Sequence, residues 1–322
     1  MIQIPVGQDQ KQQRLDRFLK KYLPKASLSH IYKIIRKDAR LNGKRVKPEV
    51  MLQEGDVLAL YLSHEEIADL SQEKERIQAK KQFGVIFEDE NLLAVNKPKG
   101  LLTHGDGREK KNTLANQVID YLAGKGEYVF SRENTFTPAP ANRLDRNTSG
   151  IVLFGKNNEA LQALNEMIRE KDCIRKYYLA AAWGVLTRPL RLTGGMVKDE
   201  SRNRIEVVKE GEGKLMQTVL IPLAVKDGYS LIQAELITGR THQIRAHMAS
   251  QRLYILGDGK YGSPKANQRA RERFGLTSQF LHACRLEIVK GKGPLSDLAG
   301  LTLTAPLPAA LNRIKDELFG EE

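Results

Sequence analysis

The first candidate for chemistry in this chain is a single carboxylate. Asp145 lies in the stretch NRLDRNTSG, residues 142–150, between two arginines and ahead of two hydroxyl side chains and a glycine. Two prolines upstream prevent a helix from running into this stretch, and Gly150 permits a sharp turn where the apolar run 151–154 begins a strand. Asp145 is therefore predicted on a loop held by a strand, a common place for catalytic groups. From this stretch alone, an Arg–Asp pair that closes a surface turn is an equal alternative.

A second group of polar side chains occurs at residues 236–247, LITGRTHQIRAH. If a helix begins at Thr241, Arg245 lies on the same face of that helix one turn later. A guanidinium forms a bidentate pair with a carboxylate, so Arg245 is a candidate partner for an acid elsewhere in the chain. His242 and His247 are five residues apart and lack a neighbouring Glu or Cys, which argues against a zinc site.

Between these two groups, residues 175–184 read RKYYLAAAWG. In a strand, alternate residues face opposite ways, so Lys176 and Tyr178 share one face and Tyr177 takes the other. One tyrosine is then expected in the core, and the other is free to be displayed. By propensity alone, either tyrosine is more often a packing residue than a catalytic one.

The elements that must position these groups are mostly strands. Apolar runs outnumber helical patterns after residue 83, and successive runs are often too close for a crossover helix. This spacing predicts an α+β domain with a mixed, mostly antiparallel β-sheet and flanking helices. A Rossmann sheet is not expected, because Gly211 and Gly213, near a strand, lack the GxGxxG spacing and a following helix. The expected strands are 85–87, 92–95, 151–154, 177–186, 216–224 and 230–237, and the expected helices carry Leu114, Val118 and Leu122, and Leu161, Leu164, Met167 and Ile168.

Positive charge is concentrated near the N-terminus. The 322-residue chain carries 52 Lys and Arg against 39 Asp and Glu, a net charge of +13, and 41% of its residues are hydrophobic. Residues 11–50 hold thirteen of the basic residues and three of the acidic ones, a net charge of +10. Such a local excess indicates a nucleic-acid partner more than a solubility device. A membrane surface is disfavoured because the helices expected here lack a wide, aromatic-rich apolar face.

The same basic region has the pattern of a small domain. Apolar residues recur at helical spacing over 15–23 and 28–35. The Asn-Gly pair at 42–43 is typical of a two-residue hairpin turn, and a strand is expected at 57–62.

We expect two domains, because the chain exceeds the roughly 150 residues of a typical domain. Residues 63–82 are charged and nearly free of large apolar side chains, which predicts a linker between domains at 1–62 and 83–322. Cys173 and Cys284 are far apart without ligand spacing, so neither a disulfide framework nor a zinc site is supported. The N-terminus lacks a signal pattern, and no apolar run approaches the roughly 18 residues of a membrane span, so a cytoplasmic protein is expected.

Residues 12–62 resemble the alpha-L RNA-binding module that occurs in a small-subunit ribosomal protein and in several RNA-modifying enzymes. The resemblance rests on RLDRFL at 14–19, VKP at 46–48 and Gly-Asp at 55–56. A DNA-binding helical unit is the alternative, but a helix-turn-helix has no need of the hairpin. The module implies contacts to RNA from six basic side chains, Lys33, Arg36, Lys37, Arg40, Lys44 and Arg45.

The remainder of the chain resembles the RNA pseudouridine synthases of the large-subunit ribosomal RNA type. Four motifs occur in the family's order and spacing, and NKPKGL at 96–101 and LH at 281–282 also fit. Together with the N-terminal module, the resemblance covers nearly the whole chain. The four motifs are RLD at 143–145 with TSG at 148–150, KxYxA at 176–180, GRTHQIRAH at 239–247, and LGD at 256–258 with YG at 261–262.

This resemblance implies the isomerisation of uridine to pseudouridine in RNA, in which the base is detached from ribose, turned and rejoined through carbon. Asp145 would be the essential carboxylate, as nucleophile or as general base, and Arg245 would pair with it. Tyr178 would stack on the flipped uracil and help move a proton, while Arg143 would hold the RNA around the vacated position. No metal and no cofactor is implied. The other residues carried over as substrate contacts are Ile244, as an apolar pocket wall, Arg240 and His242.

The implied partner is structured ribosomal RNA with the target uridine in a single-stranded loop or bulge, bound by a monomer away from any membrane. A base inside a duplex is inaccessible, so the enzyme must flip it and needs an aromatic platform and positive charge. A non-catalytic RNA-binding or ribosome-assembly protein on the same scaffold is the alternative, and the intact set of Asp145, Tyr178 and Arg245 argues against it. A zinc-dependent base deaminase would need a ligand set that is missing. Asn142 replaces the His common in the family, which argues against a charged role there.

Overall fold

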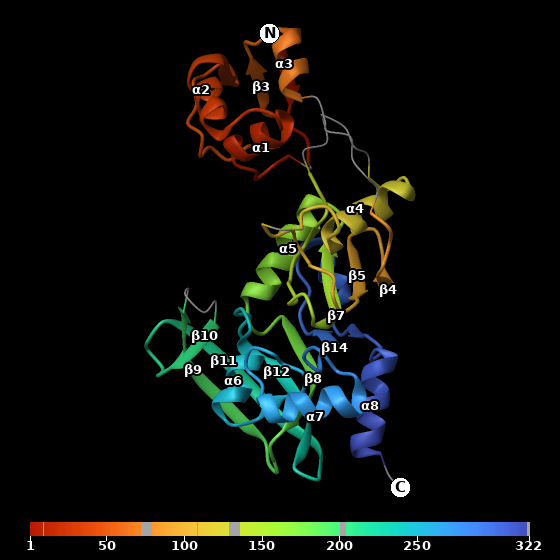
Figure 1. Ribbon diagram of the computed structural model, residues 1–322. Coiled ribbons are helices and arrows are strands. Elements are labelled where there is room, and N and C mark those ends of the chain that lie inside the picture. The colour runs from red at the N-terminus through yellow and green to blue at the C-terminus, as the bar shows by residue number, and fades with distance from the viewer. Residues whose placement is uncertain (9, 72–78, 108, 129–135, 200–203, 321–322) are drawn as a thin grey trace.

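The computed structural model describes the whole chain except residues 9, 72–78, 108, 129–135, 200–203 and 321–322. The N-terminal elements are β1 (Ile2–Pro5), α1 (Leu15–Tyr22), α2 (Leu28–Asp38), β2 (Ala39–Leu41), β3 (Val57–Leu60) and α3 (His64–Ser71). They form a unit of their own at one end of the molecule, with an antiparallel sheet in the order β1-β3-β2 (Figure 1).

The two helices predicted in this unit are confirmed, and each buries its apolar face. Phe18 of α1 and Ile31 of α2 are completely buried, whereas Lys33 on the outer side of α2 is exposed. Ser27 caps α2, because its hydroxyl accepts a hydrogen bond of 3.2 Å from the backbone N–H of His30.

The predicted hairpin turn is also confirmed. Asn42 and Gly43 both have positive φ, 49° and 77°, as the tight two-residue turn requires. The backbones of Leu41 and Lys44 exchange hydrogen bonds across it. The chain after Lys44 then leaves the sheet, and β2 takes its longer pairing with β3 instead.

The segment predicted as a linker, 63–82, begins with helix α3. Ile67 is fully buried in the N-terminal core, and Leu70 packs against that core. The sequence left part of this linker open to being helical, and two apolar side chains among many charged ones give only a weak helical pattern. Residues 72–78 lie outside the described part of the chain.

The N-terminal unit contacts helix α5 (Asn158–Arg169) of the larger unit. The Lys11 ammonium lies 2.6 Å from a carboxylate oxygen of Glu159. The side-chain amide of Asn158 donates a hydrogen bond of 2.9 Å to the backbone carbonyl of Lys11. An ion pair and a hydrogen bond at the first turn of α5 therefore join the two units.

The larger unit is built on one twelve-stranded sheet, which confirms the predicted mixed, mostly antiparallel α+β architecture. Its strands are β4 (Gly84–Glu88), β5 (Leu92–Lys97), β6 (Ala139–Pro140), β7 (Ser149–Gly155), β8 (Ile174–Trp183), β9 (Leu190–Asp199), β10 (Arg204–Val208), β11 (Lys214–Lys226), β12 (Tyr229–Leu236), β13 (Tyr254–Ile255), β14 (Leu281–Ile288) and β15 (Thr302–Thr304). The main order is β10-β9-β11-β12-β8-β14-β7-β5-β4. Among the strand pairings of the described residues, only β7 with β14 is parallel.

Helices flank this sheet, and two of those predicted are confirmed. The helices are α4 (Leu114–Gly124), α5, α6 (Gln243–Ser250), α7 (Pro264–Phe274) and α8 (Ala309–Phe319), with a 3-10 helix at Gly293–Leu298. α5 packs on β7, α6 on β10 and β11, and α8 on β11 and β12. Within the described residues, no helix combines the length and the apolar character needed to cross a bilayer.

The parallel pair β7–β14 lies near the centre of the sheet, and Gly150 allows its close approach. Ala283 of β14 pairs with Gly150, whose φ is 114°. A Cβ at position 150 would lie 2.2 Å from the carbonyl oxygen of Ala283. The glycine predicted to permit a turn is thus also required because the neighbouring backbone occupies the space of a side chain.

Strand β8 confirms the predicted alternation of its tyrosines but not the display of one of them. Tyr178 packs with Ala180 and Ile244 in the main core cluster, and Tyr177 lies outside that cluster. The side chains of Tyr178 and Tyr177 are only 6% and 7% exposed. Neither tyrosine is displayed, and the Arg285 guanidinium covers the Tyr177 ring, 4.2 Å from its centroid.

Candidate active site

The loop that carries Asp145 is fixed on both sides. The Thr103 hydroxyl accepts a hydrogen bond from the backbone N–H of Leu144 and donates one to its carbonyl, at 3.2 and 3.1 Å. The Asn142 amide donates to the carbonyl of Ile151 and accepts from the N–H of Leu153, at 3.1 and 2.8 Å. Asn142 thus acts through one donor and one acceptor on β7, a task for which no charge is needed.

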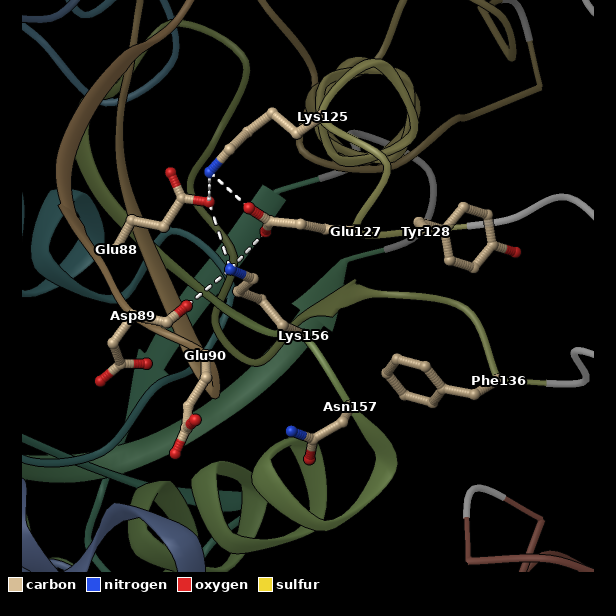
Figure 2. A pocket seen from close by; sticks show the side chains of 9 residues that line it. All are labelled: Glu88, Asp89, Glu90, Lys125, Glu127, Tyr128, Phe136, Lys156 and Asn157. Carbon is tan, nitrogen blue, oxygen red and sulfur yellow. Dashed lines mark hydrogen bonds and ion pairs between the residues drawn. The ribbon is translucent and has the colours of Figure 1, made fainter.

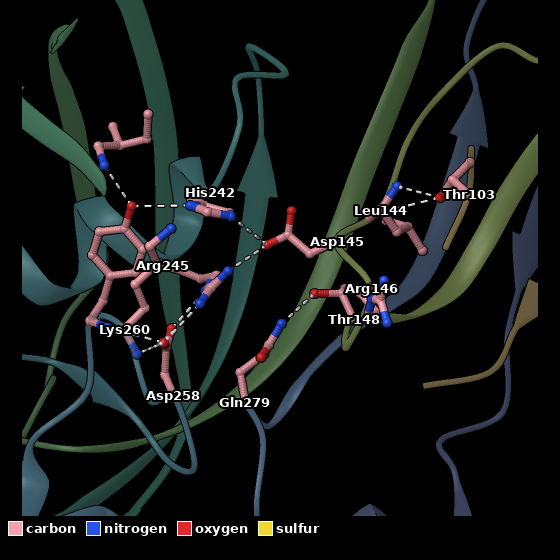
Figure 3. Close-up of polar contacts among 12 residues, drawn as sticks. Thr103, Leu144, Asp145, Arg146, Thr148, His242, Arg245, Asp258, Lys260 and Gln279 are labelled. Carbon is pink, nitrogen blue, oxygen red and sulfur yellow. Dashed lines mark hydrogen bonds and ion pairs between the residues drawn. The ribbon is translucent and has the colours of Figure 1, made fainter. Parts of the chain in front are cut away.

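Arg245 lies between two carboxylates and reaches Asp145, as predicted (Figure 3). Its Nη1 donates a hydrogen bond of 2.8 Å to Oδ2 of Asp145. Its Nε and Nη2 donate to Oδ2 and Oδ1 of Asp258, at 2.7 and 2.9 Å. The guanidinium is therefore held in one orientation by a bidentate pair, and the third nitrogen is aimed at Asp145.

Asp258, which supplies this anchor, is completely buried. Its Oδ1 also accepts hydrogen bonds from the backbone N–H groups of Lys260 and Tyr261, at 2.9 and 3.0 Å. Burial opposes ionisation of this carboxyl, but the hydrogen bonds and charge of Arg245 and the two backbone donors lower its pKa. The sequence motif contained Asp258, but its spacing gave no sign of a partner thirteen residues away.

Tyr178 lies two strands across from the Asp145 loop, in register with Ala283, which in turn pairs with Gly150. Burial, reinforced by the negative charge of Asp145, raises the pKa of the Tyr178 phenol. The hydroxyl is therefore protonated at neutral pH and close enough to Asp145 to feel its charge. Ile244 and Leu144 share the core cluster around this ring.

His242 faces Asp145 from the start of α6. The helix begins at Gln243, two residues later than expected, and His242 adopts a left-handed conformation with φ 53°. Its Nε2 lies 3.8 Å from Oδ2 of Asp145, and its Nδ1 lies 3.1 Å from the hydroxyl of Tyr261. The structure thus brings His242 to the carboxylate, where the sequence predicted a contact to RNA.

Lys97 is a buried cation that sequence reasoning did not single out, although it lies in the NKPKGL motif. Its ammonium donates to the carbonyls of Pro98, Leu101 and Arg146, at 3.0, 2.8 and 3.1 Å. Burial lowers the pKa of Lys97 to about 7, and the charge of Asp145 opposes this shift. The three carbonyls tie the NKPKGL turn to the residue that follows Asp145.

The other residues predicted to contact RNA do not converge on Asp145. Arg143 and Arg240 are exposed. Arg146, unexplained by the sequence, is exposed and lies 3.3 Å from Asp106. Of the six basic side chains predicted in the N-terminal unit, Lys33, Arg36, Lys37, Lys44 and Arg45 are exposed and Arg40 is half-buried.

Two cavities in the described residues lie outside this polar centre. One, of about 620 Å³, is lined by a network in which Lys125 and Lys156 each pair with Glu88 and Glu127 (Figure 2). The other, of about 470 Å³, is lined by the NKPKGL turn and Arg146. Neither is lined by Asp145.

Among the described residues, one group of side chains has metal-ligand atoms close together. It comprises Glu170, Asp172 and Cys173, whose ligand atoms lie within 4.8 Å of one another. Both carboxylates already have cationic partners, Lys292 at 2.6 Å from Glu170 and Lys290 at 2.5 Å from Asp172. These contacts fit two ion pairs and give no support to a metal site.

The family model and the sequence relatives that match this chain belong to the same family. Residues 91–250 match the family model described as RNA pseudouridylate synthase. The chain is 32% identical to the ribosomal large subunit pseudouridine synthase C of Pasteurella multocida, over 97% of this chain and 92% of that protein. It is 31% identical to the protein of the same name from Vibrio cholerae, over 96% and 94%.

Solved structures agree at the level of the fold. Human RNA pseudouridylate synthase domain containing 4 superposes with a TM-score of 0.56 at 22% identity, over 72% of this chain and 93% of that chain. Human RNA pseudouridylate synthase domain containing 1 superposes with a TM-score of 0.54 at 21% identity, over 71% of this chain and 87% of that chain. With the sequence relatives and the family model, these comparisons show that the chain belongs to the RNA pseudouridylate synthase family.

Proposed function

We propose that this enzyme converts uridine to pseudouridine in large-subunit ribosomal RNA. The names of its relatives, which align over nearly the full length of both chains, support this substrate. The reaction breaks the bond between ribose carbon and uracil nitrogen and forms one to a ring carbon. That ring carbon loses a proton, and the nitrogen gains one. Every step is within reach of carboxylate, phenol and backbone chemistry.

The observation that carries this proposal is a carboxylate with one fixed and one available oxygen. Oδ2 of Asp145 accepts the hydrogen bond from Arg245, while Oδ1 has no hydrogen-bond partner among the described residues (Figure 3). Such an arrangement orients Oδ1 toward a substrate without using it for structure. As nucleophile or as general base, Asp145 would act through this oxygen.

The neighbouring side chains suit the remaining tasks. Tyr178 keeps its phenolic proton because burial raises its pKa, so it can stack on a uracil ring and exchange a proton with its carbon. Ile244 packs against the same core and forms the apolar wall beside it. Arg143 is exposed two residues before Asp145, where it can hold the RNA. Arg240 and the basic side chains of the N-terminal unit would guide the strand from further away.

The test is an Asp145→Asn variant, which keeps the size and hydrogen-bonding shape of the side chain. We expect pseudouridine formation to fall by about a thousandfold or more, with RNA affinity within a few-fold of that of the unchanged chain. Product is measured by mapping pseudouridine in ribosomal RNA from cells with and without the gene, and then with the variant. Normal product from Asp145→Asn would overturn the proposal, as would an unchanged map on loss of the gene.

We further propose that the N-terminal unit is the dock for structured RNA and that the protein acts as a cytoplasmic monomer. The exposed basic side chains of α2 and the hairpin turn support the first point. Sedimentation of the free chain and of its RNA complex tests the second. A single chain per RNA is expected, and two chains per RNA would contradict it.

A further inference from the structure

The hydrogen bonds of His242 and Tyr261 form a short directed path into the site. The backbone N–H of Ile205, on edge strand β10, donates a hydrogen bond of 2.7 Å to the Tyr261 hydroxyl. That hydroxyl lies 3.1 Å from Nδ1 of His242, and Nε2 of the same ring lies 3.8 Å from Oδ2 of Asp145. Figure 3 shows the His242 ring directed at the carboxylate beside Arg245.

The backbone N–H of Ile205 is the first donor on this path, and it indicates where the other protons lie. A backbone N–H can only donate, so the Tyr261 oxygen accepts from Ile205. Among the described residues, the acceptor within hydrogen-bond distance of its own proton is Nδ1 of His242. A neutral imidazole that accepts at Nδ1 carries its proton on Nε2, which faces Asp145.

The reverse arrangement places a nitrogen lone pair against a negatively charged oxygen. With the proton on Nδ1, the bare lone pair of Nε2 would face the carboxylate oxygen at 3.8 Å. Burial lowers the pKa of His242, although the charge of Asp145 opposes this, so the ring is neutral rather than doubly protonated. The charged groups that face the ring are Asp145, Arg245, Lys260 and Asp258.

We propose that Tyr261 is a positioning residue that holds His242 in its Nε2–H tautomer, so that a neutral imidazole donates toward Oδ2 of Asp145. Together with Arg245, this donor keeps Oδ2 occupied and leaves Oδ1 for the substrate. The 3.8 Å separation is longer than a hydrogen bond and closes when RNA fills the site, since catalytic hydrogen bonds tighten on substrate binding. The role rests on the proposed function of Asp145.

The tautomer is read directly by nitrogen NMR of the full-length chain with labelled histidine. In the unchanged protein, we expect His242 to show a protonated Nε2 and an unprotonated Nδ1 at neutral pH. Tyr261→Phe removes only the hydroxyl and keeps the ring that Arg204 and Arg245 contact at 4.9 and 5.2 Å. In this variant, we expect a mixture of both tautomers. A proton on Nδ1 in the unchanged protein, or an unaltered tautomer in Tyr261→Phe, would overturn the inference.

A matched control is Tyr229→Phe. Tyr229 also packs against aromatic neighbours, with its ring 5.2 Å from that of Trp183. We expect the His242 signals of this variant to match those of the unchanged protein. A tautomer shift of equal size in Tyr229→Phe would count against a specific effect of Tyr261.

Two substitutions of His242 separate the two nitrogens in catalysis. The amide nitrogen of Gln can take the place of Nε2, and that of Asn the place of Nδ1. We expect His242→Gln to keep a kcat within about tenfold of the unchanged enzyme, and His242→Asn to lose more. Asn tolerates the left-handed backbone at this position better than Gln, so backbone strain works against the expected order. The reverse order would contradict a donor at Nε2.

The combined variants distinguish positioning from folding. Tyr261→Phe alone is expected to lower kcat by about tenfold with KM within twofold. A Gln at position 242 has no tautomer to fix. In the His242→Gln background, Tyr261→Phe should therefore lower kcat almost no further. An equal loss in both backgrounds would show that Tyr261 acts only through the fold. Failure of the proposed function would instead appear as product formation by Asp145→Asn. The NMR result on the unchanged protein does not depend on that outcome.

Discussion

Arg245 is the residue on which the orientation of Asp145 depends most directly. Three of its N–H groups bond two carboxylates from one rigid plane, and the buried Asp258 fixes that plane. A lysine ammonium is a single point on a flexible stem and cannot reproduce this fork. The three hydrogen bonds at this position therefore require the planar guanidinium as well as its positive charge.

We expect Arg245→Lys to lower kcat by about a hundredfold or more and to reduce the free energy of unfolding by roughly 2–4 kcal/mol, because Asp258 loses part of its buried pairing. Single-turnover rates and urea denaturation measure the two effects. The matched control is Arg273→Lys, whose partner Glu317 lies at 2.8 Å with both side chains well exposed. That exchange should change stability by less than about 1 kcal/mol. Similar losses in both variants would show that the fork is not required.

Among single residues, the sequence predicted the reactive side chains of the family's motifs. It did not predict which other side chains hold these reactive groups in position. The family resemblance implied that Arg245 pairs with Asp145, and the 2.8 Å hydrogen bond between them agrees, since a guanidinium and a carboxylate readily form such a pair. Lys97 and Tyr261 act through contacts whose partners are set by the fold, such as the Arg146 carbonyl 49 residues away. No periodicity or spacing reports a contact of that kind.

Among the elements, strands β7 and β14 set the position of the Asp145 loop. Their parallel pairing covers only two residue pairs in register, Ser149 with His282 and Gly150 with Ala283. The Ser149 hydroxyl also lies 2.8 Å from Nδ1 of His282, and Nε2 of that ring lies 3.1 Å from the carbonyl of Ala305. This short junction thus depends on close backbone approach and on one buried histidine.

We expect Gly150→Ala to destabilise the protein by roughly 3–4 kcal/mol, since a Cβ would collide with the Ala283 carbonyl in a backbone conformation that also disfavours alanine. Gly228→Ala is the control, because Gly228 has a similar positive φ of 80° but open space around it. It should cost only about 1–2 kcal/mol. Thermal or urea unfolding compares them. Equal costs would show that the contact with β14 does not limit the residue at 150.

Helix α6 buries His247 against β11, which predicts a pH dependence of stability. Nδ1 of His247 lies 2.9 Å from the Thr218 hydroxyl, and burial lowers the pKa of this histidine to about 4. The unfolded chain takes up a proton as the pH falls below about 6.5, whereas the folded chain resists until about 4. The stability that the neutral ring contributes is therefore complete above pH 6.5 and lost between these values.

We expect the free energy of unfolding to fall by roughly 3 kcal/mol across this window through His247 alone. His247→Phe should flatten this part of the curve, measured by urea unfolding from pH 7 to pH 4. The exposed His30 provides the control, and His30→Gln should leave the slope unchanged. A curve of the same shape for His247→Phe would contradict the assignment.

The elements themselves were predictable wherever one face is apolar and the other polar. Helices α1, α2 and α4 follow this rule. The central strand β7 is instead buried along its whole length, and the continuous apolar run 151–154 predicted it. Helix α7 does not follow the rule, because only Ala266, Ala270 and Phe274 of its eleven residues are buried. Its ends did carry signals, since Ser263 caps it, a proline begins it, and Gly275 ends it in a left-handed conformation. The strand order, with a single parallel pair among the described strands, has no counterpart in local patterns.

For the whole molecule, the separation of charge and chemistry into two units is the main feature. The N-terminal unit contains the strongly basic segment 11–50, of net charge +10, and the larger unit contains the Asp145 site. Figure 1 shows the two units at opposite ends of the molecule. Because counterions are released when cations meet RNA phosphates, the contribution of each unit to binding can be measured through salt.

We expect replacement of Lys33, Arg36 and Lys37 by Gln to weaken RNA binding and to reduce the slope of log affinity against log salt by about 2, with kcat at saturating RNA unchanged. The control replaces Arg188, Lys265 and Arg313, three exposed cations of the larger unit, by Gln. The salt slope of this control variant should change by less than about half of the change expected for the N-terminal variant. Equal slopes for the two triple variants would show that the N-terminal unit is not the dock.

The central pairing of β7 with β14 also has a consequence for how the chain acquires activity during synthesis. Asp145 precedes Arg245 by 100 residues, and Ser149 precedes its partner His282 by 133. Contacts so distant in sequence close late and slowly, because a long loop must be ordered before they form. A nascent chain that has left the ribosome only as far as β12 therefore exposes the basic N-terminal unit, able to meet RNA, while the carboxylate still lacks both its guanidinium and its neighbouring strand. On the proposal that the N-terminal unit docks RNA, binding competence precedes catalytic competence, and the enzyme can reach its RNA before it is able to modify it.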